Sequence, residues 1–215
     1  MTTRRKVKAV HRDFMAHVDA LIRLDTQNQS RYRAGPGRPS SSTISKRQLE
    51  LLTESIFARA YSHLEILIED VFILYCYGKP TISGKNVKSF LAPKNTSHAR
   101  DMIKSGMNFL DWNTPDIVIK RSDVYLEDMN PMKVAVTTHR AALNDMRKIR
   151  NAIAHQSSEA RLKFKSVVLS NLRAAPLQEL EPGEFLLQSV PSSQNQYFLL
   201  YYLNLMKSVA NTATG

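Results

Sequence analysis

The stretch from Ser45 to Tyr77 places the strongest limit on what this chain can fold into, because it is long and contains neither glycine nor proline. Every third or fourth position in it is apolar or small, apart from His63, and this spacing places side chains on one face of an α-helix. The positions are Leu49, Leu52, Ile56, Ala60, His63, Leu67, Val71 and Leu74. We therefore expect one long core helix over 45–77, ended by Gly78 and Pro80.

Further helices are expected wherever the same spacing returns. It predicts helices over 5–27, about 97–110, 132–155, 160–172 and 197–210. Pro131 suits the first turn of the helix over 132–155, and Ser157 suits the cap that precedes 160–172. The helix over 132–155 contains no breaker, so it is expected to be one uninterrupted element.

A segment rich in glycine and proline is expected to separate the first two helices. Residues 28–43 include Ala34-Gly-Pro-Gly-Arg-Pro-Ser, whose glycines and prolines sustain neither helix nor strand. Arg31, Arg33 and Arg38 make this segment basic. We interpret it as a mobile loop, which is either a plain linker or an arm that follows an RNA backbone.

Two other parts of the chain have less regular patterns. Residues 81–130 are expected to form a connecting insertion around the short helix at 97–110, and 114–128 fits either a short strand or an irregular crossover. Residues 182–190 predict a tight turn that leads into an extended piece.

The composition favours one globular domain over 1–215, since 43% of the 215 residues are hydrophobic. The formal net charge of +11 favours a polyanionic partner, with nucleic acid ahead of acidic lipid. The alternative is that the excess of basic residues has no specific role.

Cysteine usage and hydropathy bear on the compartment. The single cysteine, Cys76, lies among apolar residues, so the sequence offers neither a disulfide framework nor a zinc-binding cluster. No metal ion and no other cofactor are expected. No secretory apolar region follows the first basic residues, and the longest apolar run, 66–77, is short for a bilayer and carries Glu69 and Asp70. We expect a cytoplasmic protein without membrane contact.

Placed on a helical wheel, the helix over 132–155 has one polar, cationic side and one apolar side. The polar side holds Arg140, Asn144, Arg147, Lys148, Asn151 and His155. The apolar stripe holds Ala142, Met146, Ile149 and Ile153. We therefore expect the helix to pack on one side and to offer an RNA-binding ridge on the other, with Arg140, Arg147 and Lys148 contacting phosphates.

The end of this helix sets Arg150, Asn151 and His155 close together in the sequence. Arginine grips a phosphate through a bidentate fork, and histidine gains and loses a proton near neutral pH. Asn151 and His155 are neighbours at i and i+4, so Asn151 is placed to orient the imidazole or to bridge it to substrate. These residue types indicate RNA cleavage. The structural alternatives are that Arg150 covers apolar surface and pairs with a carboxylate, and that His155 binds free carbonyls at the helix end.

The segment Arg150-Asn-Ala-Ile-Ala-His155 resembles the signature of the HEPN superfamily, in which a polar residue follows an arginine and a histidine closes a short gap. The chain is also similar to the RiboL-PSP branch in Ala58-Arg-Ala-Tyr-Ser-His-Leu-Glu65, in Met146-Arg-Lys-Ile and in Pro182-Gly-Glu-Phe-Leu186. The likeness covers residues 48–77 and 143–205.

This resemblance implies an all-α, up-and-down helical bundle that dimerises, with the motif helices of two subunits lining a cleft that cleaves RNA without a metal ion. It implies that His155 is the general acid or base, that Arg150 holds the phosphate and that Asn151 positions them. Glu65 is a weaker candidate for supporting Arg150. Many members are toxins or antiphage-defence effectors, so RNA, a second copy of the chain and an antitoxin or sensor are the expected partners. The alternative is a non-catalytic RNA-binding, protein-binding or dimerisation module.

Overall fold

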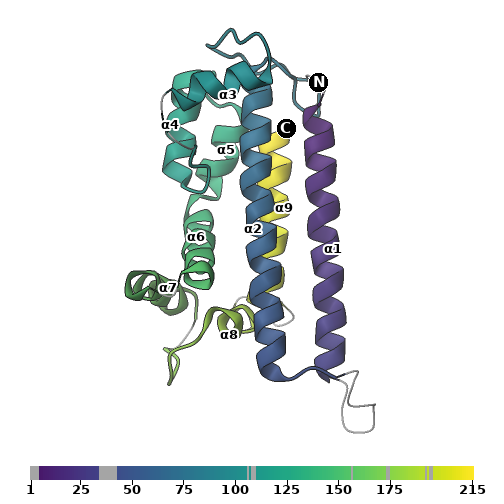
Figure 1. Ribbon diagram of the computed structural model, residues 1–215, viewed down its shortest axis with the longest axis vertical. Helices are drawn as coiled ribbons and strands as arrows, with labels where there is room; N and C mark the ends of the chain where they lie inside the picture. Colours follow the sequence, from purple (N-terminus) through teal and green to yellow (C-terminus); the bar gives the residue numbers. More distant parts are fainter. Residues whose placement is uncertain are drawn as a thin grey trace. The chain divides into compact units, whose positions relative to one another are not determined.

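The computed structural model describes residues 5–33, 43–105, 107, 110–155, 157–172, 175–191, 193 and 196–215. Within these residues the chain is helical, and its β-contacts are the isolated bridges Ser89–Leu126 and Ser189–Tyr197. The helices, shown in Figure 1, are α1 (Val7–Arg33), α2 (Lys46–Cys76), α3 (Thr96–Lys104), α4 (Pro115–Tyr125), α5 (Pro131–Thr138), α6 (Arg140–Ala154), α7 (Ser158–Asn171), α8 (Pro182–Leu186) and α9 (Phe198–Thr214). The all-α fold class predicted from the sequence is therefore confirmed.

The chain divides into two compact units. Unit 1 comprises Met1–Ala16, Ser62–Asn144 and Lys207–Gly215, and unit 2 comprises His17–Tyr61 and Asp145–Met206. Helices α1, α2, α6 and α9 each contribute residues to both units. The expectation of a single domain over 1–215 stays a prediction.

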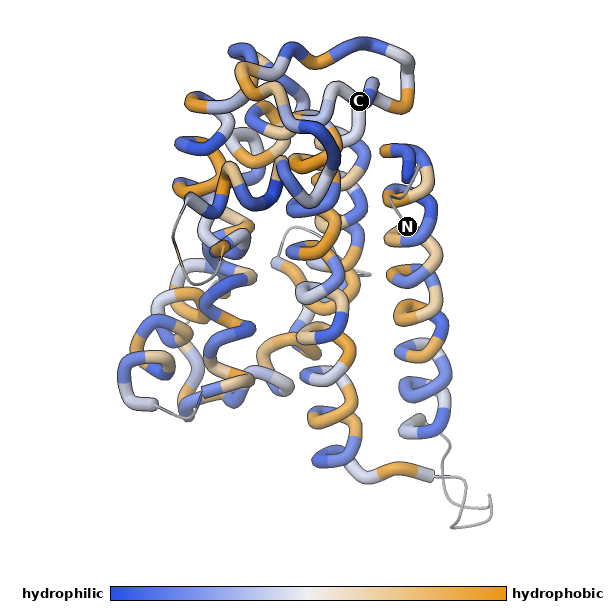
Figure 2. The backbone as a smooth tube through the Cα atoms, turned by 45° about the horizontal axis from the view of Figure 1, so that its top comes forward, coloured by the Kyte–Doolittle hydropathy of each residue, from blue (hydrophilic) through white to orange (hydrophobic). Residues whose placement is uncertain are grey.

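Helix α2 confirms the long helix expected over 45–77. Its part in unit 2 buries Ile56, Phe57, Ala60 and Tyr61, and its part in unit 1 buries an unbroken run over 71–76. One apolar stripe does not produce an unbroken buried run, so the last turns of α2 are covered on all sides. Figure 2 shows the hydrophobic positions, in orange, distributed along this helix.

The core of unit 1 forms around the end of α2. The Tyr75 hydroxyl donates to the Ala213 carbonyl of α9 at 2.8 Å, and burial raises the pKa of Tyr75. The rings of Phe72 and Trp112 lie 5.2 Å apart. Burial also raises the pKa of the Cys76 thiol to about 12, so this cysteine is a neutral core side chain at physiological pH.

Aromatic side chains from four helices form the centre of unit 2. The rings of Phe185 (α8) and Phe198 (α9) stack at 4.5 Å, and Phe164 (α7) meets Phe185 edge-on at 5.7 Å. Phe57 (α2) meets Tyr202 (α9) edge-on at 5.9 Å. Offset and edge-on ring contacts of this kind add to the stabilisation from buried apolar area, so these helices are held by a shared cluster.

Helix α1 runs farther than expected, to Arg33, so residues 28–33 are helical and do not belong to a loop. Asp25 and Asn28 are buried, and the Tyr197 hydroxyl donates to the Asp25 carboxylate within unit 2. Asp25 and Asn28 therefore face packed surface, and Asn28 does not end the helix. The rest of the expected loop, 34–42, lies outside the described residues.

The prediction of one uninterrupted helix over 132–155 is wrong, because this segment forms two helices, α5 and α6, separated at His139. His139 has φ −103° and ψ 15°, outside the helical region, while its N–H still donates to the Ala135 carbonyl at 3.1 Å. The residues before it, Thr137 and Thr138, are β-branched and lose side-chain freedom in a helix. The sequence at this break contains neither glycine nor proline, so no helix-breaking residue indicates it.

Residues 114–128, expected as a strand or a crossover, contain helix α4. Pro115, Val118 and Arg121 are buried at intervals of three. The Arg121 guanidinium lies 4.6 Å from the centroid of the Trp112 ring. A charged residue thus occupies a buried position through a cation–π contact, and this conceals the helical period from a hydropathy pattern.

Residues 182–190, expected as a turn and an extended piece, begin with helix α8. Pro182 stands in its first turn, and Glu181 and Glu184 each accept a hydrogen bond from the other's backbone N–H. The short helix is therefore started by a capping box.

Gly183 brings α8 against α2 within unit 2. A methyl group added to Gly183 would lie 2.6 Å from the Glu50 carbonyl oxygen, which is too close for packed atoms. The Gly183 N–H donates to Glu54 Oε1 at 3.0 Å. The absence of a side chain is what permits this approach.

Gly183→Ala is expected to lower the free energy of unfolding by about 1–3 kcal/mol, because α8 has to move away from α2 to admit the methyl group. Urea denaturation followed by circular dichroism measures this change. Ser30→Ala, at an exposed position of α1 in the same unit, is the control. An unchanged transition midpoint for Gly183→Ala would contradict the close packing.

Candidate functional site

Helix α6 carries the three candidate catalytic residues and packs along one side. Leu143, Met146 and Ile149 are 4%, 0% and 0% exposed. Met146 and Ile149 belong to the predicted stripe, whereas its other two members, Ala142 and Ile153, are half-buried. The buried stripe is therefore rotated toward Leu143, which the wheel did not place in it.

Arg150 and Asn151 form a hydrogen-bonded pair on the flank of α6. Arg150 is half-buried, and its Nη1 donates to Asn151 Oδ1 at 3.1 Å. The amide thus holds the guanidinium, whereas the sequence placed it to orient His155. Among the described residues, no carboxylate pairs with Arg150. The charge of this guanidinium is therefore not neutralised within the described part of the chain.

His155 follows Ala154, the last residue of α6, and is exposed. Its backbone N–H donates to the Asn151 carbonyl at 2.8 Å, so the helical hydrogen bonding continues up to this residue. The imidazole makes no hydrogen bond with another described residue. It is accessible to a substrate, which proton transfer requires.

Two basic residues of the predicted ridge, Arg140 and Lys148, already form ion pairs with carboxylates. Arg140 Nε lies 2.7 Å from an Asp116 carboxylate oxygen in unit 1. Lys148 Nζ lies 3.6 Å from Asp145 and 3.4 Å from Ser166 Oγ in unit 2. The Arg140 pair is exposed and the Lys148 pair is half-buried. Exposed ion pairs are weak, so a phosphate competes with Asp116 for Arg140.

Three candidate residues lie in settings that the sequence did not reveal. Arg147 is half-buried, and its buried Nε has no hydrogen-bond partner among the described residues. Glu65 lies on α2 in unit 1 and Arg150 lies in unit 2, so the supporting role of Glu65 stays a prediction. Arg140 also belongs to unit 1, whereas Arg147 and Lys148 belong to unit 2.

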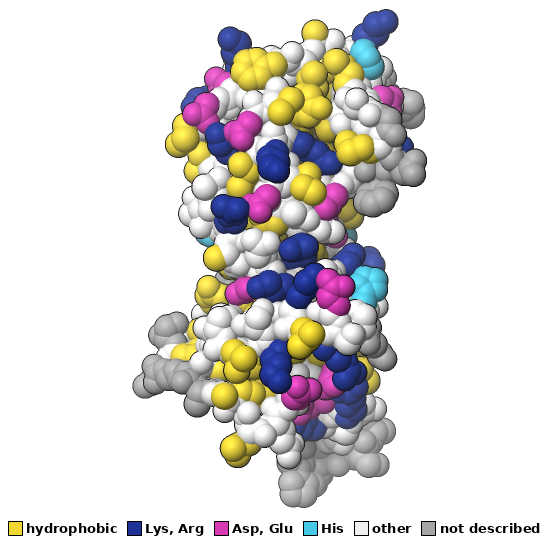
Figure 3. Space-filling view, turned by 90° about the vertical axis from the view of Figure 1, so that its left-hand side faces the viewer, with side chains coloured by type: hydrophobic (Ala, Val, Ile, Leu, Met, Phe, Trp, Pro, Cys, Tyr) yellow, Lys and Arg dark blue, Asp and Glu magenta, His cyan; other side chains and the backbone are white. Residues whose placement is uncertain are grey.

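The excess of basic residues is accompanied by local pairing with acids. On the face in Figure 3, many lysine and arginine side chains, in dark blue, lie near aspartate and glutamate side chains, in magenta. Lys133 lies 2.6 Å from Asp128, and Lys163 lies 2.6 Å from Glu159. The net charge of +11 therefore supplies a general attraction for polyanions more than a defined site.

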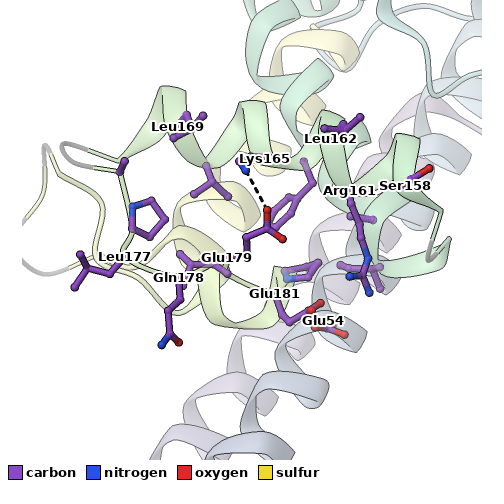
Figure 4. Close-up of a pocket in the computed structure, with 18 of the residues that line it drawn as sticks. Glu54, Ser158, Arg161, Leu162, Lys165, Leu169, Leu177, Gln178, Glu179 and Glu181 are labelled. Atoms are coloured by element: carbon purple, nitrogen blue, oxygen red, sulfur yellow. Dashed lines mark hydrogen bonds and ion pairs between the residues drawn. The ribbon is translucent and has the colours of Figure 1, made fainter.

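A pocket of about 580 Å³ opens in unit 2 between α7 and the segment 175–182, a feature that the sequence analysis did not predict. Parts of α2 and α6 complete its walls, as Figure 4 shows. The aliphatic side chains in its lining include Leu51, Ile153, Leu162, Val168, Leu169 and Leu177. Ile153 comes from the last turn of α6, between Asn151 and His155, so this wall of the pocket adjoins the candidate catalytic residues in the sequence.

Charged residues stand at one end of the pocket. Glu54 is half-buried and accepts the Gly183 N–H. Burial raises the pKa of Glu54, and the Gly183 hydrogen bond and the nearby Arg47 oppose this shift. Figure 4 shows Arg161 extending toward the end where Glu54 and Glu181 lie.

The pH dependence of folding is expected to report the burial of Glu54. Its pKa is higher in the folded chain than in the unfolded chain, so the folded state keeps the proton longer, and this group destabilises the fold as the pH rises from about 4 to 7. Glu54→Gln keeps an oxygen acceptor for Gly183 and removes the charge. The variant is therefore expected to gain stability over wild type at pH 7 and to lose that advantage at pH 4.

Urea titrations of both proteins at several pH values measure the difference. Glu159→Gln is the control, because Glu159 is exposed and its pairing with Lys163 lowers its pKa. That variant should change stability in the opposite direction with pH. A pH-independent difference between Glu54→Gln and wild type would show that folding leaves the pKa of Glu54 unchanged.

The described residues contain no group of three or more histidine, cysteine, aspartate or glutamate side chains that could hold a metal ion. In the same part of the chain, no helix is both long enough and apolar enough to cross a membrane. Comparisons of the chain with protein-family models, with curated proteins and with solved structures found no match.

Proposed function

We propose that this protein is an endoribonuclease of the HEPN type, which cleaves RNA without a metal ion as a homodimer and acts as a toxin or antiphage-defence effector. The supporting observation is the end of α6. There, a hydrogen-bonded Arg150–Asn151 pair is followed by an exposed His155 whose imidazole has no hydrogen-bond partner among the described residues. Cleavage at a ribose phosphate requires both a fixed cation and a free proton-transfer group.

In the proposed reaction, His155 removes the proton from a ribose 2′-hydroxyl. The 2′-oxygen attacks the adjacent phosphorus, and the bond from phosphorus to the 5′-oxygen breaks. The leaving 5′-oxygen takes a proton from a second imidazole, and the product strand ends in a 2′,3′-cyclic phosphate. Arg150 stabilises the charge that develops on the phosphoryl oxygens, while Asn151 keeps the guanidinium oriented.

The geometry of α6 favours a site shared by two copies of the chain. Five residues along a helix correspond to a rotation of about 140°, so Arg150 and His155 start from different sides of α6. One protomer also supplies only one of the two imidazoles that the reaction uses. A two-fold dimer brings the second histidine and the second arginine to the same phosphate.

The remaining basic residues have a place in this proposal. Lys148 and Arg140 exchange their carboxylate partners for RNA phosphates, and Arg147 lies on the same helix. The proposed activity belongs in the cytoplasm, and a toxic nuclease there needs an antitoxin or a sensor as a regulator. No cofactor takes part.

Removing the imidazole is expected to abolish cleavage and to preserve binding. His155→Ala should lower the cleavage rate by about a hundredfold or more, while RNA affinity stays within about twofold of wild type. The assay incubates end-labelled RNA with protein in excess EDTA and identifies the product termini. His17→Ala, at an exposed position of α1, is the matched control and should cleave like wild type.

Two outcomes would count against the nuclease. Cleavage that stops in EDTA and returns with magnesium would contradict proton transfer by His155. Binding of RNA by all the proteins without scission would support the alternative, a non-catalytic HEPN-like binding module.

Mixed dimers test whether the active site is shared. Wild type and His155→Ala are co-refolded at several ratios, and cleavage is measured at constant total protein. If each cleft needs both imidazoles, activity should follow the square of the wild-type fraction. A linear decrease would show that each protomer works alone and would remove the dimeric site from the proposal.

A further inference from the structure

We infer that the pocket between α7 and the segment 175–182 is a docking groove for an amphipathic helix of a partner protein. The partner helix places aliphatic side chains in the groove and an acidic side chain beside Arg161. This inference does not depend on the proposed nuclease activity, since Arg150, Asn151 and His155 are not among the residues that line the pocket.

The first argument is that α7 is apolar on two sides. Its inner side buries Phe164, Val167 and Val168 in unit 2. Its outer side carries Leu162 and Leu169, which are 69% and 50% exposed and line the pocket. A surface helix normally has one apolar side, so the second side indicates a contact that the described residues do not provide.

The second argument concerns the length of the apolar surface. Leu162 and Leu169 are seven residues apart, which places them about 10 Å apart along α7. On the opposite wall, the side chain of Leu177 is fully exposed, as Figure 4 shows. A small ligand inside the pocket would leave these rim leucines in water. A helix of about three turns covers them, and its side chains fill the pocket below.

The chemistry of the lining also favours a helix. The accessible apolar groups are aliphatic, and the aromatic residue in the lining, Phe164, is only 5% exposed. Nucleobases bind chiefly by stacking on exposed aromatic rings or guanidinium planes, and this groove offers few such surfaces. Leucine and isoleucine side chains on a helix match an aliphatic groove better.

The charges of the groove specify an acidic residue on the partner. Lys165 is paired with Glu179 at 3.0 Å, and Arg47 is paired with Glu50 at 3.3 Å. The third cation of the lining, Arg161, is exposed and makes no ion pair with another residue that the structure describes.

The carboxylates at the same end already have donors. Glu54 accepts the Gly183 N–H, and Glu181 accepts the Glu184 N–H. Arg161 is therefore the charged group of the lining that a partner's carboxylate complements best.

A display library tests the inference directly. Peptides of about 16 residues are randomised on a helical background and selected on the full-length protein. Enriched sequences should carry Leu, Ile or Met at i, i+3 or i+4, and i+7, with Asp or Glu on the flank. The most enriched peptide is then synthesised with a fluorescent label, and its affinity is measured by anisotropy.

Substitutions in the groove should weaken this peptide, and a matched substitution elsewhere should not. Leu162→Lys and Leu169→Lys are expected to raise the dissociation constant at least about tenfold, because each removes an aliphatic contact. Arg161→Glu should weaken binding by about tenfold, and Arg161→Gln by less. The control is Leu24→Lys, because Leu24 is an exposed leucine on α1 in the same unit and does not line the pocket. It should stay within about twofold of wild type.

Circular dichroism of each variant checks that the fold is kept. The inference is overturned if selection enriches no peptide, if the enriched peptides show the alternating pattern of a strand or a basic flank, or if the groove variants bind as tightly as Leu24→Lys. It is also overturned if sedimentation shows a wild-type dimer that Leu162→Lys dissociates, since a second copy of the chain would then occupy the groove.

Discussion

The burial of α2 is the constraint on which the rest of the structure depends. One helix supplies Phe57 to the aromatic cluster of unit 2 and Tyr75 to the core of unit 1. The last turns of α2, which are buried over 71–76, tolerate neither a helix breaker nor an unpaired charge, and the sequence between Ser45 and Tyr77 contains no glycine or proline. The two cores therefore share one helix, which supplies buried side chains to both.

Hydrophobic periodicity predicted much of the fold, and the predictions that were wrong have physical causes. Helix α2 and the Ser157-capped helix α7 were predicted closely, because apolar spacing and capping act locally. The break at His139 and the buried Arg121 were missed. The break at His139 follows two β-branched threonines and has no glycine or proline to mark it. The burial of Arg121 depends on the face of Trp112, which a hydropathy pattern does not show. Helix α8 was missed although its capping residues are present in the sequence, because the segment is short.

The sequence placed the candidate residues on their helix better than it placed their side-chain contacts. It singled out Arg150, Asn151 and His155, and α6 carries the first two to its end with the third immediately after it. The spacing at i and i+4 suggested a link from Asn151 to His155, whereas the amide contacts the adjacent Arg150. Side-chain pairing at a helix end depends on rotamers, which spacing does not determine. The sequence indicates the pocket beside α7 only indirectly, through the apolar residues on two sides of that helix.

The segment Pro-Gly-Glu-Phe has a structural explanation for each of its four residues. Pro182 opens α8, Gly183 admits the backbone of α2, Glu184 completes the capping box and Phe185 stacks in the aromatic cluster. These four roles are structural, so none of them is evidence for proton transfer or phosphate binding. Another chain that contains this tetrapeptide is therefore expected to pack a short helix against a longer one in the same way. The tetrapeptide alone does not indicate whether that chain is an enzyme.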